Sequence, residues 1–327
     1  MSYRTILILL SALCAVLFAA SLLIGPSGIS PIDGVSALFS GDGAAGLVMR
    51  ELRLPRAILG IGVGAALGLS GAAMQGFLRN PLAEPGLIGT SAGAALGAVI
   101  AIQTGLYALF ALALPLAALA GAGVAVALIL ILAGREGRAL VLILAGIAVS
   151  ALAAAATALV LNLAPSPYAA AEIVFWMMGS LADRSMTHVA LALPFLIVGA
   201  LILLRAGAGL DALSLGEDAA ASMGISLKKL RLQIVFGTAL MVGAATAVAG
   251  AIGFVGLVVP HLLRKSVGAR PSRLLPASAL GGAAMLTLAD IATRVIAPER
   301  DLKLGVLTAL VGAPFFLSMI RKMGREG

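Results

Sequence analysis

Long apolar runs separated by short polar stretches make up nearly the whole chain. A helix needs about 20 mainly apolar residues to cross the hydrocarbon core of a bilayer, and most of these runs approach that length. The pattern therefore predicts an all-α polytopic membrane protein with about ten transmembrane helices. The expected spans cover residues 5–24, 56–78, 86–102, 106–133, 140–163, 189–204, 232–249, 251–263, 274–294 and 305–320.

Two of these runs allow a second interpretation. Residues 5–24 resemble a signal peptide, but they lack a clear small-x-small cleavage site and further spans follow. Residues 251–263 are short and form either a separate eighth span or the tail of the seventh. Counting them as a span puts about two thirds of the Lys and Arg residues on the cytoplasmic side, as the positive-inside rule requires. Ten spans with both termini in the cytoplasm are therefore expected.

Composition agrees with a helical bundle in lipid. Only 11% of the residues are charged and 61% are hydrophobic, whereas soluble domains carry about 25% charged residues. The 40 glycines suit tight packing, because small residues let helices approach closely in a membrane. The net charge of +8 follows from the basic inner loops, so the lipid bilayer is an expected partner and nucleic acid is not.

Two glycine- and alanine-rich segments, residues 64–72 and 243–251, resemble each other. They lie in spans two and seven, and this odd offset would invert the second copy in the membrane. Inverted repeats are common in transporters, where the pathway lies near the repeat interface. Helices rich in Ala and Gly also match by chance, so a repeat of spans 2–5 and 7–10 is a hypothesis at this point.

Arginines gather at the predicted outer surface, where the positive-inside rule disfavours them. Arg53 and Arg56 flank a proline at the mouth of span two. They contact either lipid headgroups or acidic groups on an external partner. Asp290 and Arg294 stand one helical turn apart in span nine, which allows an i,i+4 ion pair on the same outer surface.

The inner connection between spans two and three contains two prolines and a glycine, which force an irregular turn. Irregular backbone at membrane depth is tolerated only where it is buried in protein or faces a cavity. The small residues that follow allow either close helix contact or room for a pathway. The predicted pathway or gate residues are Asn80, Pro81, Pro85, Gly86, Ser91 and Gly93.

The longest cytoplasmic loop, residues 205–231, is expected to contain a short helix. Glu217 and Asp218 would occupy its first turn and Gly224 its C-cap. Such a helix lies on lipid or fits a groove on another protein.

Several kinds of chemistry are not expected. The sequence has no glycine-rich phosphate loop ending in Gly-Lys-Ser or Gly-Lys-Thr, so ATP hydrolysis by that route is excluded. His188 and His261 are far apart along the chain, and no nucleophile–base set is visible. The chain is expected to be a transport subunit with no permanently bound cofactor and no metal site.

Four motifs together resemble the FecCD-type permeases, the membrane subunits of ABC importers for iron–siderophores, haem and cobalamin. The resemblance covers residues from about 50 to 322, nearly the whole chain. The motifs are Arg53-Leu-Pro-Arg56, residues 79–86 with the preceding Gln75, residues 253–264 and residues 308–315.

The resemblance implies a homodimer in the bacterial inner (plasma) membrane, with two cytoplasmic ATPase subunits that use ATP and a periplasmic substrate-binding protein. It also implies that Arg53, Arg56 and Arg294 dock the binding protein. The residues implied in coupling to the ATPase are Gly216, Glu217, Asp218, Ala220, Met223 and Gly224.

The sequence departs from the family at two places. Residues 300–305 replace a usual Glu-Leu-Pro, and Ser91-Ala92-Gly93 replaces a Ser-Asn-Gly or Ser-Ser-Gly. These changes leave the fold intact but put the cargo in doubt. Lys303-Leu304-Gly305 and residues 175–181 favour haem, followed by a ferric siderophore. The alternatives are a cobalamin importer permease or a stand-alone secondary transporter.

Overall fold

The computed structural model describes residues 1–25, 28–40, 43–110, 112–134, 139–164, 166–297 and 302–326; Arg300 and Asp301 lie outside them. Every element in these residues is helical. Seven of the described helices are long and apolar enough to cross a membrane, and three shorter apolar helices lie among them. The all-α polytopic fold predicted from the sequence is confirmed.

The bounds of the elements are α1 Tyr3–Leu23, α2 Pro31–Ser40, α3 Gly43–Leu47, the π-helix η1 Val48–Arg53, α4 Leu54–Phe77, the 3-10 helix η2 Pro85–Ile88, α5 Thr90–Gln103, the 3-10 helix η3 Leu106–Ala108, α6 Ala113–Ala133, α7 Ala139–Asn162, α8 Pro167–Met177, α9 Met186–Arg205, α10 Gly207–Leu213, α11 Glu217–Ser222, α12 Leu227–Ala249, α13 Val255–Arg264, α14 Pro271–Ile296 and α15 Leu304–Glu326.

The helices α2, α3, α8 and α10 were not predicted, because they are too short to register as spans. The predicted eighth span also differs in its start. α13 begins at Val255 rather than at 251, and its ten residues make it about 15 Å long, half the thickness of the hydrocarbon core. α13 is therefore a half-length helix, and residues 251–254 before it are irregular rather than helical.

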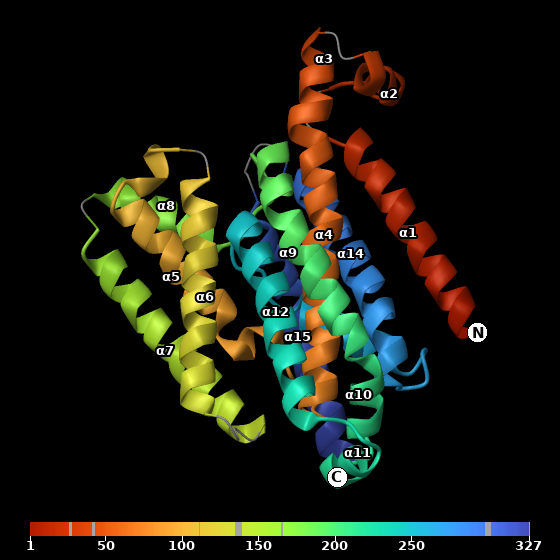
Figure 1. Cartoon of the computed structure of the whole chain (residues 1–327). Helices are drawn as coiled ribbons and strands as arrows, with labels where there is room; N and C mark the ends of the chain where they lie inside the picture. The colour runs from red at the N-terminus through yellow and green to blue at the C-terminus, as the bar shows by residue number, and fades with distance from the viewer. Residues whose placement is uncertain are drawn as a thin grey trace.

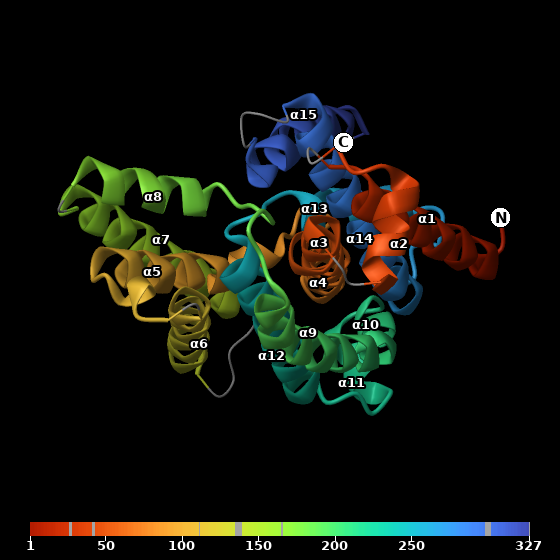
Figure 2. The ribbon, with the colours of Figure 1, turned by 90° about the horizontal axis from the view of Figure 1, so that it is seen from above.

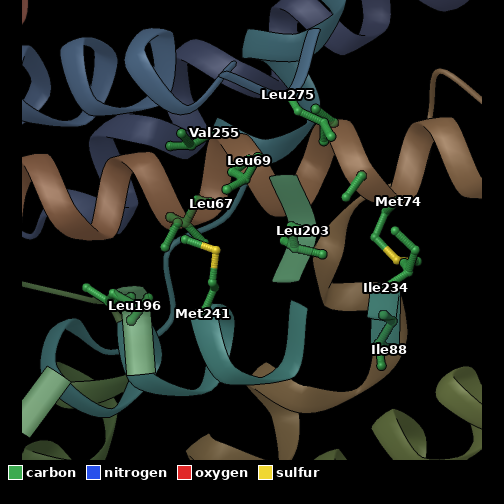
Figure 3. Close-up of a cluster of buried hydrophobic side chains, with 14 of the residues drawn as sticks. Leu67, Leu69, Met74, Ile88, Leu196, Leu203, Ile234, Met241, Val255 and Leu275 are labelled. Carbon is green, nitrogen blue, oxygen red and sulfur yellow. The ribbon is translucent and has the colours of Figure 1, made fainter. Parts of the chain in front are cut away.

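Three helices form the buried centre of the bundle. Much of α4, α12 and α14 is buried inside the protein, whereas α1 lies at the periphery and exposes most of its surface (Figures 1 and 2). Large apolar side chains from α4, α9, α12 and α14 fill the space between these helices (Figure 3).

Small residues decide how closely α4 and α14 approach. A Cβ added to Gly68 of α4 would overlap the carbonyl oxygen of Ser278 on α14. A Cβ on Gly64 would lie 2.8 Å from Ala283 Cα. The backbones of α4 and α14 are therefore in direct contact. Such close approach lets dispersion forces hold two membrane helices together.

The packing supports the predicted inverted repeat. α4 and α12 run in opposite directions (Figure 1). α5 packs against α6, α7 and α12, and α13 makes the corresponding contacts with α14, α15 and α4. Gly64 faces α14, and its counterpart Gly243 faces Ala122 of α6. The two copies therefore exchange equivalent contacts across the centre of the molecule.

Both termini lie in the half of the molecule that carries α10 and α11 (Figure 1). This agrees with the prediction that the two ends share one side. We name this half the inner end and the opposite half, with α2 and α3, the outer end, after the predicted topology.

Candidate functional site

A cluster of charges lies at the outer end, where α4 and α14 meet α1. Both oxygens of the Asp290 carboxylate accept hydrogen bonds from Arg56 Nε, Oδ1 at 3.0 Å and Oδ2 at 3.1 Å. Oδ2 also accepts one from Arg294 Nη2 at 2.9 Å. Its side chain is only 2% exposed. One buried carboxylate thus balances two guanidinium groups, and the i,i+4 ion pair predicted for Asp290 and Arg294 is confirmed.

Arg294, together with Arg53, holds the end of α1. Arg294 Nη1 donates to the carbonyl oxygens of Ser21 and Ile24, both at 2.8 Å, and Nη2 donates to Ser21 Oγ at 2.7 Å. Arg53 Nη1 donates to the carbonyls of Leu22 and Leu23 at 2.9 and 3.0 Å. The last carbonyls of a helix have no partner within it and carry the negative end of its dipole, so two cations stabilise this end of α1.

These contacts change the expectation for docking. The structure brings Arg53, Arg56 and Arg294 together, as the sequence suggested. However, it places Arg53 and Arg294 in the interior, 5% and 9% exposed. Arg56 is the member whose side chain reaches the surface, 21% exposed. A docking role is therefore a prediction that this conformation favours for Arg56 alone.

The turn between α4 and η2 is held by its own residues. Asn80 Oδ1 accepts a hydrogen bond from the amide of Leu82 at 2.9 Å. Asn80 is exposed and Pro81 is partly exposed at the inner surface. Arg79, just before them, has φ +48°, a conformation that a non-glycine residue seldom adopts.

A small cavity of about 170 Å³ lies beside the end of this turn. Pro85, Gly86 and Ser91 line it together with Glu84, and residues 251–253 close its other side. Leu67 and Val242 also line it, which places the cavity near the middle of α4 and in the second half of α12. The structure therefore brings three of the predicted gate residues to one place.

Gly93 lies elsewhere. A Cβ on Gly93 would stand 2.5 Å from Ala125 Cβ and 2.6 Å from the carbonyl oxygen of Gly121. Gly93 therefore permits α5 and α6 to pack closely and does not line the cavity with the other gate residues.

A buried polar link between α4 and α13 was not predicted from the sequence. Gln75 Nε2 donates to the carbonyl of Leu257 at 3.2 Å, and Arg264 Nη2 donates to Gln75 Oε1 at 2.8 Å. The motif residues Gln75 and Arg264 were visible in the sequence, but nothing there showed that they touch.

The predicted coupling segment forms a short helix, α11, as expected. Gly216 and Gly224 stand at its two ends with φ +115° and +81°, and Glu217 and Asp218 occupy the first turn. Ala220 is buried, whereas Met223 is 61% exposed beside the exposed acids. The segment thus presents a mixed apolar and acidic surface at the inner end.

A second helix, α10, ties this segment to the core through Asp211. The Asp211 carboxylate accepts the amide of Ser272 at 2.8 Å, Ser272 Oγ at 2.7 Å and Arg270 Nε at 2.9 Å. Ser272 is in the first turn of α14, so a side chain from α10 caps that helix. This anchor was also missed, because residues about 60 positions apart gave no local signal.

Asp211 makes the stability of the protein depend on pH. Burial alone would raise the pKa of Asp211, but hydrogen bonds from Ser272 and Arg270 outweigh burial and hold the pKa below its ordinary value. A carboxyl with a lowered folded pKa stabilises the protein above its unfolded pKa of about 3.9 and loses that contribution as pH falls through the folded value.

We expect Asp211→Ala to lower the free energy of unfolding at pH 7 by about 1–2 kcal/mol, the usual cost of losing a helix cap. Thermal unfolding in detergent at pH 7 and at pH 3 measures this, with Asp33→Ala as the control. The difference between wild type and Asp211→Ala should shrink at pH 3. An equal difference at both values would contradict the assignment.

The described residues contain no group of three or more His, Cys, Asp and Glu side chains placed to hold a metal ion. The single cysteine, Cys14, is buried between α1 and α14 and donates to the carbonyl of Leu280 at 3.2 Å. The candidate site has three parts: the charged cluster around Asp290 at the outer end, the cluster around Asp211 at the inner end, and the small cavity between them.

Known proteins are similar to this chain in sequence. The family model of the FecCD transport family matches residues 13–322. The hemin transport system permease protein HmuU of Yersinia pestis is 38% identical over 279 residues, covering 84% of this chain and 84% of that protein. The cobalamin import system permease protein BtuC of Halobacterium salinarum is 40% identical over 277 residues, covering 85% and 74%.

A solved structure agrees with these sequence matches. It is described as an inward-facing conformation of an ABC transporter of the proposed metal-chelate type. It has a TM-score of 0.87 to this chain at 33% identity, and the match covers 98% of this chain and 99% of that one. The similarity therefore extends over the outer cluster, the cavity and the coupling segment alike.

Proposed function

Because the chain belongs to the FecCD transport family and is a permease of an ABC importer, we propose that its cargo is haem. In this proposal, a periplasmic binding protein delivers the cargo at the outer end. Two copies of the chain form the pathway in the bacterial inner membrane. Separate ATPase subunits bind the α11 segment and supply the energy, so the chain itself needs no bound cofactor.

The choice of haem rests on a contact between residues 175–181 and residues 303–305, the two segments that favour haem in the sequence. Lys303 Nζ lies 5.4 Å from the centroid of the Phe175 ring. Beside them, the amide of Gly305 donates to the carbonyl of Gly179. An aromatic face next to an ammonium group suits a flat, apolar cargo that carries carboxylates, as haem does.

The surface around this contact supports a pathway between two copies. Phe175 is 55% exposed, and the neighbouring helices α7 and α15 carry apolar side chains that the single chain leaves uncovered, among them Leu152 and Leu310. A second copy would cover part of this surface. A smooth apolar wall binds cargo weakly, which lets the cargo leave, so specificity would rest mainly with the binding protein.

Reconstitution in proteoliposomes tests the function. The permease is assembled with and without a co-encoded ATPase, and haem, a ferric siderophore and cobalamin compete for uptake. We expect uptake only with the ATPase and ATP, and haem to be taken up in preference. Uptake without any ATPase would instead show a secondary transporter. Preferential uptake of cobalamin or of the siderophore would contradict haem as the cargo.

We expect Lys303→Ala to lower the rate of haem uptake about tenfold, the scale of one lost charge-assisted hydrogen bond. Lys265→Ala, at the inner end, is the matched control and should leave uptake unchanged. An equal rate of haem uptake in the two variants would show that Lys303 does not contact the cargo.

We expect Arg56→Gln to weaken docking of the binding protein about tenfold and to reduce its dependence on salt, because docking surfaces pair charges. Affinity is measured on the purified permease over a range of ionic strengths. Arg53→Gln should instead destabilise the protein, since Arg53 is buried against α1. Unchanged affinity and salt dependence in Arg56→Gln would contradict the docking role.

A further inference from the structure

Phe254, just before α13, has a backbone conformation that is unusual for a bulky residue. Its φ is +69°, and among the described residues only three other non-glycine residues have a positive φ. A large side chain seldom adopts this region, and such residues persist where the surrounding structure holds them. The contacts of Phe254 therefore show what holds it.

The first contact comes from the other half of the repeat. Glu84, at the end of the turn that follows α4, accepts a hydrogen bond from the Phe254 amide at its Oε1, at 2.9 Å. Pro85 fits against Gly256, where an added Cβ would lie 2.7 Å from Pro85 Cδ. Two irregular segments of the same chain, one from each half of the inverted repeat, thus interlock at the small cavity.

The second contact is with α15. A Cβ added to Gly312 would lie 2.7 Å from Phe254 Cδ1 and closer still to its Cβ and Cγ. Gly312 is buried, so the Phe254 ring lies directly on the backbone of α15. One turn further along α15, Phe315 meets His261 of α13 with ring centroids 5.8 Å apart.

We propose that Glu84 and Phe254 form a joint that makes α15 follow the inner turn during transport. This rests on the proposed transport function and adds two positioning residues to it. The carboxylate fixes the Phe254 amide, the fixed backbone aims the ring, and the ring bears on Gly312. When the turn at residues 79–89 moves, its movement reaches α15 through this chain of contacts, and α15 carries the exposed apolar face next to the cargo contact.

The geometry makes the joint specific to its residue types. Only a glycine at 312 lets the ring approach the helix backbone this closely. At position 84, the side chain must carry an acceptor to bind the Phe254 amide. Glutamine at 84 retains an acceptor oxygen of the same reach, whereas alanine removes it. This contrast separates the hydrogen bond from the charge of Glu84.

The test compares Glu84→Ala, Glu84→Gln and Phe254→Ala in the complex reconstituted with its ATPase. The matched control is Phe236→Ala, which shortens an exposed aromatic side chain on α12. The readout is cargo moved per ATP hydrolysed, together with thermal stability. We expect Glu84→Ala and Phe254→Ala to lower this ratio about fivefold, as for one lost hydrogen bond, while ATP hydrolysis continues. Glu84→Gln and Phe236→Ala should stay within about twofold.

An unchanged ratio in Glu84→Ala and Phe254→Ala would overturn the joint, and so would an equal loss in Glu84→Gln and Glu84→Ala. If the wild type itself moves no cargo, the proposed function fails and a second measurement decides the joint. Spin labels at Asn80 and Leu317, both exposed, report the distance between the turn and α15 in a Cys14→Ser background. We expect a single narrow distance distribution in the wild type and a broader one in Phe254→Ala. Equal distributions would overturn the joint without reference to any cargo.

Discussion

Replacing Asp290 by alanine is expected to destabilise the folded protein by about 3–5 kcal/mol, the cost of breaking a buried ion pair. The carboxylate is buried and balances Arg56 and Arg294 at once. Without it, Arg294 remains buried beside Arg56 with no opposing charge, and burying an uncompensated charge near a membrane costs far more than losing a surface ion pair.

Thermal unfolding and size-exclusion profiles in detergent measure this effect. Asp33→Ala is the matched control, because Asp33 is exposed and its carboxylate accepts a hydrogen bond only from the neighbouring Ser30 among the contacts described. Combining Asp290→Ala with Arg294→Leu should recover part of the loss, since no charge is then left unbalanced at α14. A wild-type unfolding temperature for Asp290→Ala would show that the cluster contributes nothing to stability.

Gly68→Val is expected to prevent α4 and α14 from packing and to leave little correctly folded protein. A Cβ at this position overlaps the Ser278 carbonyl and stands 3.1 Å from Gly282 Cα, so no rotamer relieves the clash. Both partners are backbone, which moves only if the whole helix shifts. Overpacking typically costs about 1–3 kcal/mol, and we expect more here because the helix pair is the most extensive contact in the bundle.

The control lies on the same helix. A Cβ at Gly76 would stand 3.5 Å from Leu210 Cδ1, an ordinary contact, so Gly76→Ala should leave the protein monodisperse with nearly unchanged stability. A monodisperse Gly68→Val protein with a wild-type unfolding temperature would contradict the packing described for α4 and α14.

The sequence predicted the elements that have a recognisable pattern in their own residues. Apolar runs of span length indicated the long helices, and the acidic pair followed by Gly224 indicated α11. The short helices gave no such signal. α8 is an apolar helix of 11 residues, too short to distinguish from a loop that lines the bundle. The start of α13 was misplaced because Phe254 gives no sign in the sequence of its left-handed backbone.

The site was predictable in its residues but not in its contacts. Arg53, Arg56 and Arg294 were expected on one surface, and the structure brings them together. The burial of Arg53 and Arg294 was not foreseen, because it depends on the end of α1, about 30 residues before Arg53 and 270 before Arg294. Contacts of this range depend on the packing of whole helices, and no local pattern records them.

The way in which α1 is attached has a consequence for how that helix can vary. Apart from Ser21 Oγ, the acceptors that Arg53 and Arg294 use at its end are main-chain carbonyls, which every amino acid possesses. The attachment therefore recognises where the helix stops rather than which side chains it carries. We therefore expect the exposed side chains of α1, such as Ile8 and Val16, to accept other apolar residues, provided that the helix still ends at Leu23.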